Sequence, residues 1–330
     1  MGDLPIDRKF HATVLEKLGR NPGNVIGITL WFNRAISEPQ DAKLAHVASL
    51  NKNIVFSRPT WTANSSGRVL YKELEDAKPT TAVELYVDYQ SGSLVGLTAI
   101  YTHLSSPVSR WLEVLPVKLV RIFRESKKTS SDPRSFDTNA FDFIRMYKLQ
   151  STSADPISLE PFIVKMPINY VVDAQWFQRL PYERLLENED FSWIRNKIII
   201  IGPALPGQGI LTPLSFSTGI LTSQPVVIAN AVNTLLTGQY IRTLHPMITS
   251  GLLALYCILA LYVFRKVQTS RRRFGIGIGS FLGLFVTSYL LFAVLRFQLV
   301  IFPFLMVWIL IHAYFAAKEF FPLRIVIGSR

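Results

Sequence analysis

The sequence predicts an α/β fold, a mostly parallel sheet with helices on both faces, followed by a bundle of three transmembrane helices. Two observations carry this prediction. Apolar strand-like runs alternate with helix-like segments through residues 1–245, and such alternation favours parallel strands joined by right-handed crossovers. Three apolar windows then follow at 246–264, 274–295 and 297–317. Each window has close to the ~20 residues that a helix needs to cross the hydrocarbon layer.

The elements of residues 1–245 follow from their apolar period. The segments 25–32 and 197–201 are continuous apolar runs, which is typical of strands buried on both faces. The segments 10–18 and 226–236 repeat apolar residues three or four positions apart, the period of a helix. The same patterns predict further helices at 41–50, 109–123 and 181–187, and further strands at 53–57, 83–87, 94–101 and 162–166. The polar, proline-punctuated stretch 125–160 is predicted to be a loop or an insertion.

The composition argues against several classes of function. The chain has 330 residues and a net charge of +12, but from Met247 onward nine Lys or Arg face one acid, Glu319, so the excess belongs to the apolar segment and does not indicate a nucleic-acid surface. A single cysteine, Cys257, excludes internal disulfides and CxxC sites. The five histidines lack metal-site spacing, and the loop 202–209 lacks the Lys and Ser/Thr of a phosphate-binding loop. We therefore expect neither a metal, a cofactor nor an enzyme activity.

Positive charge predicts the sidedness of the membrane segment. The link between the first two windows carries five basic residues, whereas the second link carries only Arg296. The five are Arg265, Lys266, Arg271, Arg272 and Arg273. By the positive-inside rule this link is cytoplasmic, residues 1–245 lie outside, and residues 318–330 form a cytoplasmic tail. Because the first ten residues contain no apolar run that could direct export, we expect an upstream membrane helix in the complete gene product.

The second window contains a stripe of small residues. Gly275, Gly279 and Gly283 recur every four positions, a pattern that lets another membrane helix approach closely. The partner is another window of the same chain, which we favour, or a second copy. The windows contain no acidic residue, and His312 is their one strongly titratable side chain, which argues against transport.

An ordered set of short motifs resembles a known family. Near the start, Pro5, Arg8, His11 and Ala12 match a Trp-Pro-Trp-Pro-Arg run followed by His-Ala. Later come Ile168-Asn169-Tyr170, the strand ending at Gly202, and Thr212-Pro213 before a closing helix. The set resembles the CHASE type 2 domain, an extracellular sensory module of bacterial cyclases and kinases. The resemblance covers most of residues 4–317 and is weak from about 60 to 160.

The resemblance implies a sensor in the bacterial inner (plasma) membrane with a periplasmic, extracytoplasmic domain and three transmembrane helices. Ligands of open α/β sheets bind at the carboxyl ends of strands. We therefore predict contacts to an unknown small ligand from Gln208, Thr212, Asn169 and Tyr170, beside the loop after Phe32. The family's Asp before Thr-Pro and a later His are absent here, which predicts a changed or lost ligand.

Only residues 318–330 follow the last window, so no output domain is visible in the sequence. Signal transfer would then need a separate signalling or membrane protein, and the chain could also act as a homodimer. The alternative from another class is a non-sensing structural or interaction subunit of an envelope complex.

Overall fold

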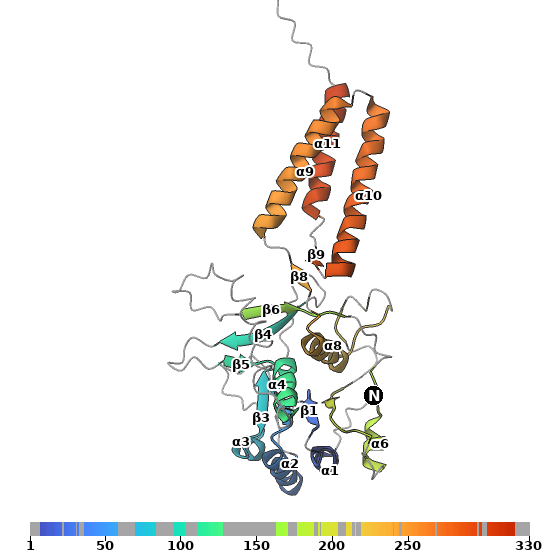
Figure 1. Ribbon diagram of the computed structural model, residues 1–330. Helices are drawn as coiled ribbons and strands as arrows, with labels where there is room; N and C mark the ends of the chain where they lie inside the picture. Colours follow the sequence, from blue (N-terminus) through green and yellow to red (C-terminus); the bar gives the residue numbers. More distant parts are fainter. Residues whose placement is uncertain are drawn as a thin grey trace, which may run out of the picture. The chain divides into compact units, whose positions relative to one another are not determined.

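The computed structural model describes most of the chain, which divides into two compact units, residues 1–240 and 241–330 (Figure 1). Each unit is described by itself. The described residues are 7–21, 23–30, 32, 36–58, 70–83, 96–102, 111–127, 163–170, 177–187, 191, 193–203, 209–212, 215, 219–239, 241–243, 246–267, 269–295, 297–298 and 302–320.

The centre of the first unit is a four-stranded sheet with the order β3-β2-β1-β7. Its strands are β1 (Val25–Ile28), β2 (Ile54–Arg58), β3 (Thr80–Val83) and β7 (Ile198–Ile201). All three neighbouring pairs are parallel. Every residue of β1 is buried, as its continuous apolar run predicts for a central strand covered on both faces. The α/β prediction is therefore confirmed for this sheet.

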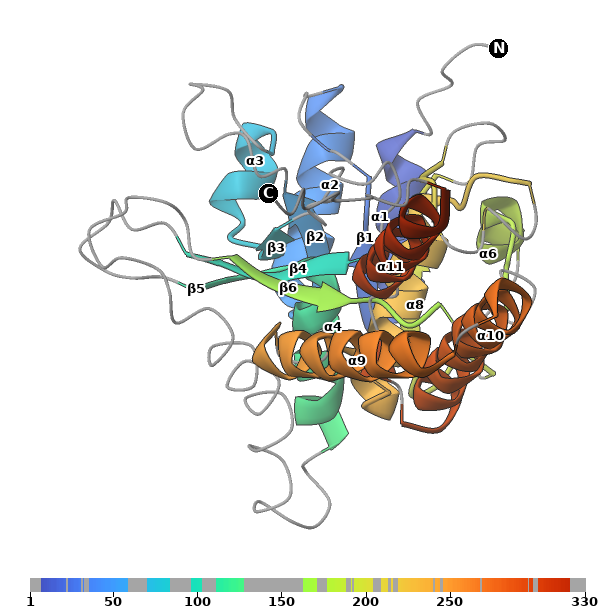
Figure 2. The ribbon, with the colours of Figure 1, turned by 90° about the horizontal axis from the view of Figure 1, so that it is seen from above.

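Helices cover both faces of the parallel sheet (Figure 2). The alternation of side chains along the strands sends Ile26 and Ile54 toward one face, and Val25 and Val55 toward the other. The first face is covered by α1 (Arg8–Gly19), α2 (Glu38–Leu50) and the short helices α3 (Lys72–Asp76) and α6 (Tyr182–Glu187). The second face is covered by α4 (Leu115–Lys127) and α8 (Gln224–Thr237). At Gly27 the packing is close, since an added Cβ would lie 2.7 Å from Leu119 Cδ1.

A second sheet is antiparallel, which the sequence analysis did not predict. It consists of β4 (Gly96–Thr102), β5 (Trp111–Glu113) and β6 (Ile163–Pro167) in the order β5-β4-β6. The helix predicted at 109–123 consequently begins only at Leu115, because residues 111–113 pair with β4. Pro116, which fits the first turn of a helix, follows this start. Most of the predicted loop, residues 128–160, lies outside the described part, as do residues 84–87 of the strand predicted at 83–87.

The second unit contains three long apolar helices, α9 (Pro246–Lys266), α10 (Ser270–Leu295) and α11 (Phe302–Phe320). Two stretches, Met247–Lys266 and Arg272–Val294, are long and apolar enough to cross a membrane, and only 6% of each is buried within the protein. A core helix of a water-soluble protein would be mostly buried, so these two helices suggest a membrane protein. The apolar stretch of α11, Phe302–Phe315, is shorter.

The third window does not begin at residue 297 as predicted. Phe297–Gln298 forms β9, which pairs in parallel with β8 (Arg242–Thr243). The helix begins at Phe302, with Pro303 in its first turn. Because β8 precedes α9 and β9 follows α10, this pairing joins the start of α9 to the end of α10. The arginine-rich link between the two helices therefore lies at the opposite end of the helical unit.

Candidate functional site

The order of the parallel strands defines where a ligand would be expected. β1 and β7 are neighbours, yet the helix after β1, α2, covers one face while the helix after β7, α8, covers the other. The chain thus diverges at the carboxyl ends of β1 and β7, which is the topological switch point at which open α/β sheets bind ligands. The first turns of α1 and α2 lie at this same edge, because each helix runs antiparallel to the strand that it adjoins.

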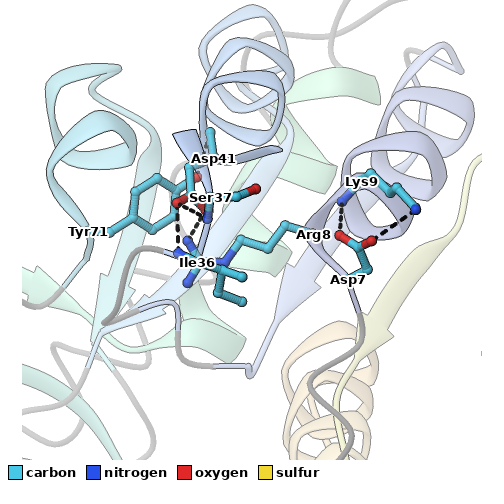
Figure 3. Close-up of polar contacts among 7 residues, drawn as sticks. All are labelled: Asp7, Arg8, Lys9, Ile36, Ser37, Asp41 and Tyr71. Carbon is cyan, nitrogen blue, oxygen red and sulfur yellow. Dashed lines mark hydrogen bonds and ion pairs between the residues drawn. The ribbon is translucent and has the colours of Figure 1, made fainter. Parts of the chain in front are cut away.

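A buried ion pair joins these two helix ends (Figure 3). Arg8 Nη1 donates a hydrogen bond to Asp41 Oδ1, and the two side chains are only 5% and 1% exposed. The other carboxylate oxygen, Asp41 Oδ2, accepts the backbone N–H groups of Ile36 at 2.8 Å and Ser37 at 3.2 Å. A carboxylate in the first turn of a helix is further favoured by the helix dipole. One carboxylate therefore holds α1, α2 and the end of the β1–α2 loop together.

Aromatic rings enclose the guanidinium group. Its central carbon lies 4.2 Å from the centroid of the Tyr71 ring and 5.6 Å from that of Phe32. The Tyr71 hydroxyl donates to the backbone oxygen of Asp41 at 2.8 Å. A charge that is paired, hydrogen-bonded and stacked in this way is tolerated in a protein interior, whereas an unpaired one is not.

His11 extends this arrangement by one helical turn. Its Nδ1 atom lies 2.7 Å from the Tyr182 hydroxyl at the start of α6, and its ring packs edge-on against Phe32. The pKa of His11 is lowered to about 4, chiefly by burial and also by the nearby Arg8 charge, while Asp7 opposes the shift. The imidazole is therefore neutral at pH 7. Burial also raises the pKa of Tyr182, which is a neutral phenol. We call the six residues Arg8, His11, Phe32, Asp41, Tyr71 and Tyr182 the Arg8 cluster.

The sequence analysis found only part of the Arg8 cluster. Arg8 and His11 entered through the family resemblance without an assigned role, and the loop after Phe32 was predicted to adjoin the ligand. Tyr71 and Tyr182 were missed. Their neighbours form no local pattern that would mark them, since the His11–Tyr182 contact joins residues 171 positions apart.

Thr212, a predicted ligand contact, lies in the turn between β7 and α8. It is fully buried, and its Oγ1 lies 2.6 Å from Thr222 Oγ1. Its backbone N–H donates to Ser215 Oγ at 3.1 Å. The polar atoms of Thr212 are thus engaged within the turn in this state of the protein. Gln208, predicted beside it, lies outside the described residues.

Asn169 and Tyr170 lie at a different place. The Asn169 N–H donates to Thr234 Oγ1 at 3.1 Å, and its side-chain amide donates to Gln239 O at 3.2 Å. These contacts are near the end of α8, whereas Thr212 is near its start, and about 15 Å of helix separates the two. Within the described part of the chain, the buried Tyr170 hydroxyl has no hydrogen-bond partner. Among the predicted ligand residues that the structure describes, Thr212 therefore lies apart from Asn169 and Tyr170.

The predicted glycine stripe of α10 has no neighbour within the described chain. A Cβ added to Gly275, Gly279 or Gly283 would meet no described heavy atom within 4 Å. Within the described residues these three glycines therefore make no close contact with another helix of the same chain, and their packing partner stays a prediction. The contact is made by Gly277, where a Cβ would overlap His312 Nε2, and whose carbonyl accepts from Trp308 Nε1 at 2.9 Å.

In the basic link, Arg273 contacts both the link itself and α11. Arg273 Nε donates to Val267 O at 2.6 Å, and its guanidinium lies 5.1 Å from the Phe315 ring. Arg265, Lys266 and Arg272 are exposed, and Arg271 lies in the first turn of α10. Across the described residues there is no group of three or more His, Cys, Asp or Glu side chains that could hold a metal ion.

These features define an α/β domain whose parallel sheet has a topological switch point, followed in the chain by apolar helices of membrane-spanning length. The family model of the CHASE2 domain matches residues 1–264, and the chain belongs to this family of extracytoplasmic sensory domains. The resemblance to the CHASE type 2 domain that its motifs suggest is thereby confirmed. No curated protein and no solved structure matches the chain.

Proposed function

We propose that the protein is a membrane-anchored sensor, whose extracytoplasmic domain passes a signal through three transmembrane helices to a separate signalling or membrane protein. The observation that carries this proposal is the CHASE2 match over residues 1–264, because that family is sensory and the match continues into α9. The switch-point edge of the parallel sheet provides the domain with a place for a stimulus to act.

Three spans are proposed from the lengths of the helices. α11 has 19 residues, which corresponds to about 28 Å of helix, close to the ~30 Å of a bilayer core. α11 also contacts both other helices through aromatic pairs, Tyr256–Phe304 with α9 and Phe281–Trp308 with α10. A helix that packs between two candidate spans is favoured as a third.

The sidedness follows from two independent features. The basic link at 265–273 favours the cytoplasm, and the β8–β9 pairing places residues 242–243 at the other end of the helical unit. The domain before β8 is then extracytoplasmic, and a bacterial inner membrane is the membrane that suits such a protein. A reporter enzyme fused after Lys266 should be active in the cytoplasm, and one fused after Gln239 should be active outside. The reverse result would contradict this topology.

α8 is the route proposed for the signal. Its start follows the turn at the switch-point edge, and eight residues lie between its end at Thr237 and the start of α9 at Pro246. A stimulus that favours one arrangement of that edge would shift the population of α8 positions and, through the short connection, of α9.

The sensor function is tested on the full chain in proteoliposomes. A library of small molecules and a pH series are screened for a change in thermal stability, and every active condition is then tested for the labelling rate of Cys257 in α9 by a membrane-permeant maleimide. A sensor should show at least one condition that changes both measurements. A structural subunit should show none, and that outcome would replace the proposal.

A further inference from the structure

The Arg8 cluster is electrically balanced only while His11 is neutral. Arg8 and Asp41 form an ion pair, so their charges cancel, and neither Tyr71 nor Tyr182 carries a charge at ordinary pH. One added proton on His11 would leave the cluster with a net positive charge in a place where the His11 residue is 6% exposed and Arg8 is 4% exposed. An uncompensated buried charge is strongly unfavourable.

The described titratable groups around His11 come from each element packed against it. Asp7 and Arg8 belong to the start of α1, Asp41 to α2, Tyr71 to the residue before α3, and Tyr182 to α6. The carboxylate of Asp41 is already committed to Arg8 and to two backbone N–H groups. Asp7 caps the start of α1 and pairs with Lys9 at 3.0 Å. Both described carboxylates near His11 therefore have partners other than the imidazole.

His11 also links three elements mechanically. It belongs to the first turns of α1, its Nδ1 contacts Tyr182 of α6, and its ring edge contacts Phe32 of the β1–α2 loop. Arg8, three residues earlier on the same helix, contacts the same Phe32 ring. A change at His11 is thus transmitted to the loop that lies at the switch-point edge.

We propose that the proton is a stimulus of this domain, and that uptake of a proton by His11 releases the first turn of α1 from α6 and from Phe32. This inference rests on the proposed sensor function and names the chemical class of its ligand. The released state then allows Phe32 and the start of α2 to rearrange at the edge from which α8 departs.

The direction of the pH dependence follows from linkage. The pKa of His11 is about 4 when the cluster is closed, chiefly because of burial, and 6.5 is the ordinary value that a released imidazole would have. Since the released state takes up its proton at a higher pH, the closed cluster is fully favoured above pH 6.5 and loses its advantage as the pH falls toward 4. Between pH 7.5 and pH 5 the released population should rise about 30-fold.

The test is hydrogen–deuterium exchange of the full chain in proteoliposomes at pH 7.5 and pH 5, corrected for the intrinsic chemical exchange rate. Peptides covering α1 and α6 should lose about 30-fold of protection at pH 5. The key variant is His11→Asn, whose side-chain oxygen can accept the Tyr182 hydrogen bond but cannot take up a proton. It should have the same corrected protection at both pH values. A variant that still loses protection like the wild type would overturn the proposal.

Two further measurements keep the proposal falsifiable if His11→Asn does not fold. His46→Asn changes an exposed histidine of α2 and should keep the wild-type response. Exchange of the imidazole carbon-bound hydrogen in the wild-type chain reports the His11 pKa directly, and a value of 6.5 or above would overturn the proposal. Loss of α1 protection at pH 5 with no change in Cys257 labelling would support acid release at His11 but overturn the sensor function.

Discussion

The two units of this protein use side chains in opposite ways. In the sensory domain, charged groups such as Arg8 and Asp41 are buried and paired with partners from distant parts of the chain. In the helical unit, large apolar side chains such as Val294 are exposed, and close contact is concentrated around α11. A substitution in the sensory domain is therefore expected to act through the loss of a buried partner. A substitution in the helical unit is expected to act through the space that is open beside the residue.

The largest effect should follow loss of the buried arginine. Arg8→Met leaves the Asp41 carboxylate, which is 1% exposed, without its counter-charge, and breaking a buried pair from one side typically costs about 3–5 kcal/mol. Urea unfolding of the full chain in detergent, followed by tryptophan fluorescence, would measure this loss.

The controls for Arg8→Met separate pairing from mere charge. Arg20 pairs with Glu16 at 2.8 Å, but the two side chains are 72% and 43% exposed, so Arg20→Met should cost at most about 0.5 kcal/mol. The double variant Arg8→Met with Asp41→Leu should recover part of the stability, because no charge remains unpaired. Equal losses in Arg8→Met and Arg20→Met would contradict the assigned role of the cluster.

In the helical unit the largest effect should be at Gly277. A Cβ at this position would overlap His312 Nε2, so Gly277→Ala must move a helix or the imidazole, and overpacking of this kind costs about 1–3 kcal/mol. The thermal midpoint in detergent, detected by a thiol-reactive dye on Cys257, should fall.

Gly279→Ala is the matched control for Gly277→Ala. It lies two residues further along the same helix, and its Cβ would meet no described atom within 4 Å. The midpoint should stay unchanged or rise slightly, because alanine favours the helix over glycine. If Gly279→Ala lowered the midpoint as much as Gly277→Ala, the stripe would be engaged by a partner, such as a second copy of the chain.

The fold was predictable where apolar residues form a continuous run or recur at a regular spacing. The apolar run at 25–32 predicted β1, which ends earlier at Ile28, and the helical period of 226–236 predicted α8 to within two residues at each end. The antiparallel sheet was not predicted, because Trp111–Glu113 is a strand only through its pairing with β4. Three residues carry too little period to compete with the helical pattern that follows them.

For the candidate site, the sequence indicated a sheet edge but not the residues that meet there. Strand order cannot be deduced from a single sequence, yet the general rule for open sheets pointed to the loop after β1, and Phe32 of that loop belongs to the Arg8 cluster. The ion pair joins residues 33 positions apart, and no local spacing identifies such a partner. In the helices the repeat of four residues indicated three glycines, whereas the fourth, Gly277, makes the contact because His312 and Trp308 of α11 face it.

A third test addresses the buried hydroxyl group of Thr212. Thr212→Val keeps the shape of the side chain but removes its 2.6 Å contact with Thr222. The Thr222 hydroxyl then keeps only its longer 3.2 Å contact with Ser215 Oγ, and the loss of the shorter hydrogen bond should cost about 1–2 kcal/mol. Thr237→Val, at an exposed threonine near the end of α8, should cost about 0.5 kcal/mol or less. If urea unfolding showed no loss for Thr212→Val, the hydroxyl would be free to serve a ligand, as the sequence analysis predicts.

The smallest expected effect concerns the end of α8. Gly238 has a φ of +66°, a left-handed conformation that ends the helix immediately before the connection to α9. Gly238→Ala should cost about 1 kcal/mol in urea unfolding, because a Cβ is disfavoured there, and Gly238→Asn should cost less. Gly251→Ala, at a glycine inside α9 with open space around it, is the control and should show no such strain. If Gly238→Ala left stability unchanged but altered the labelling rate of Cys257, the end of α8 would have shifted without loss of folding, as expected of an element that conveys a signal.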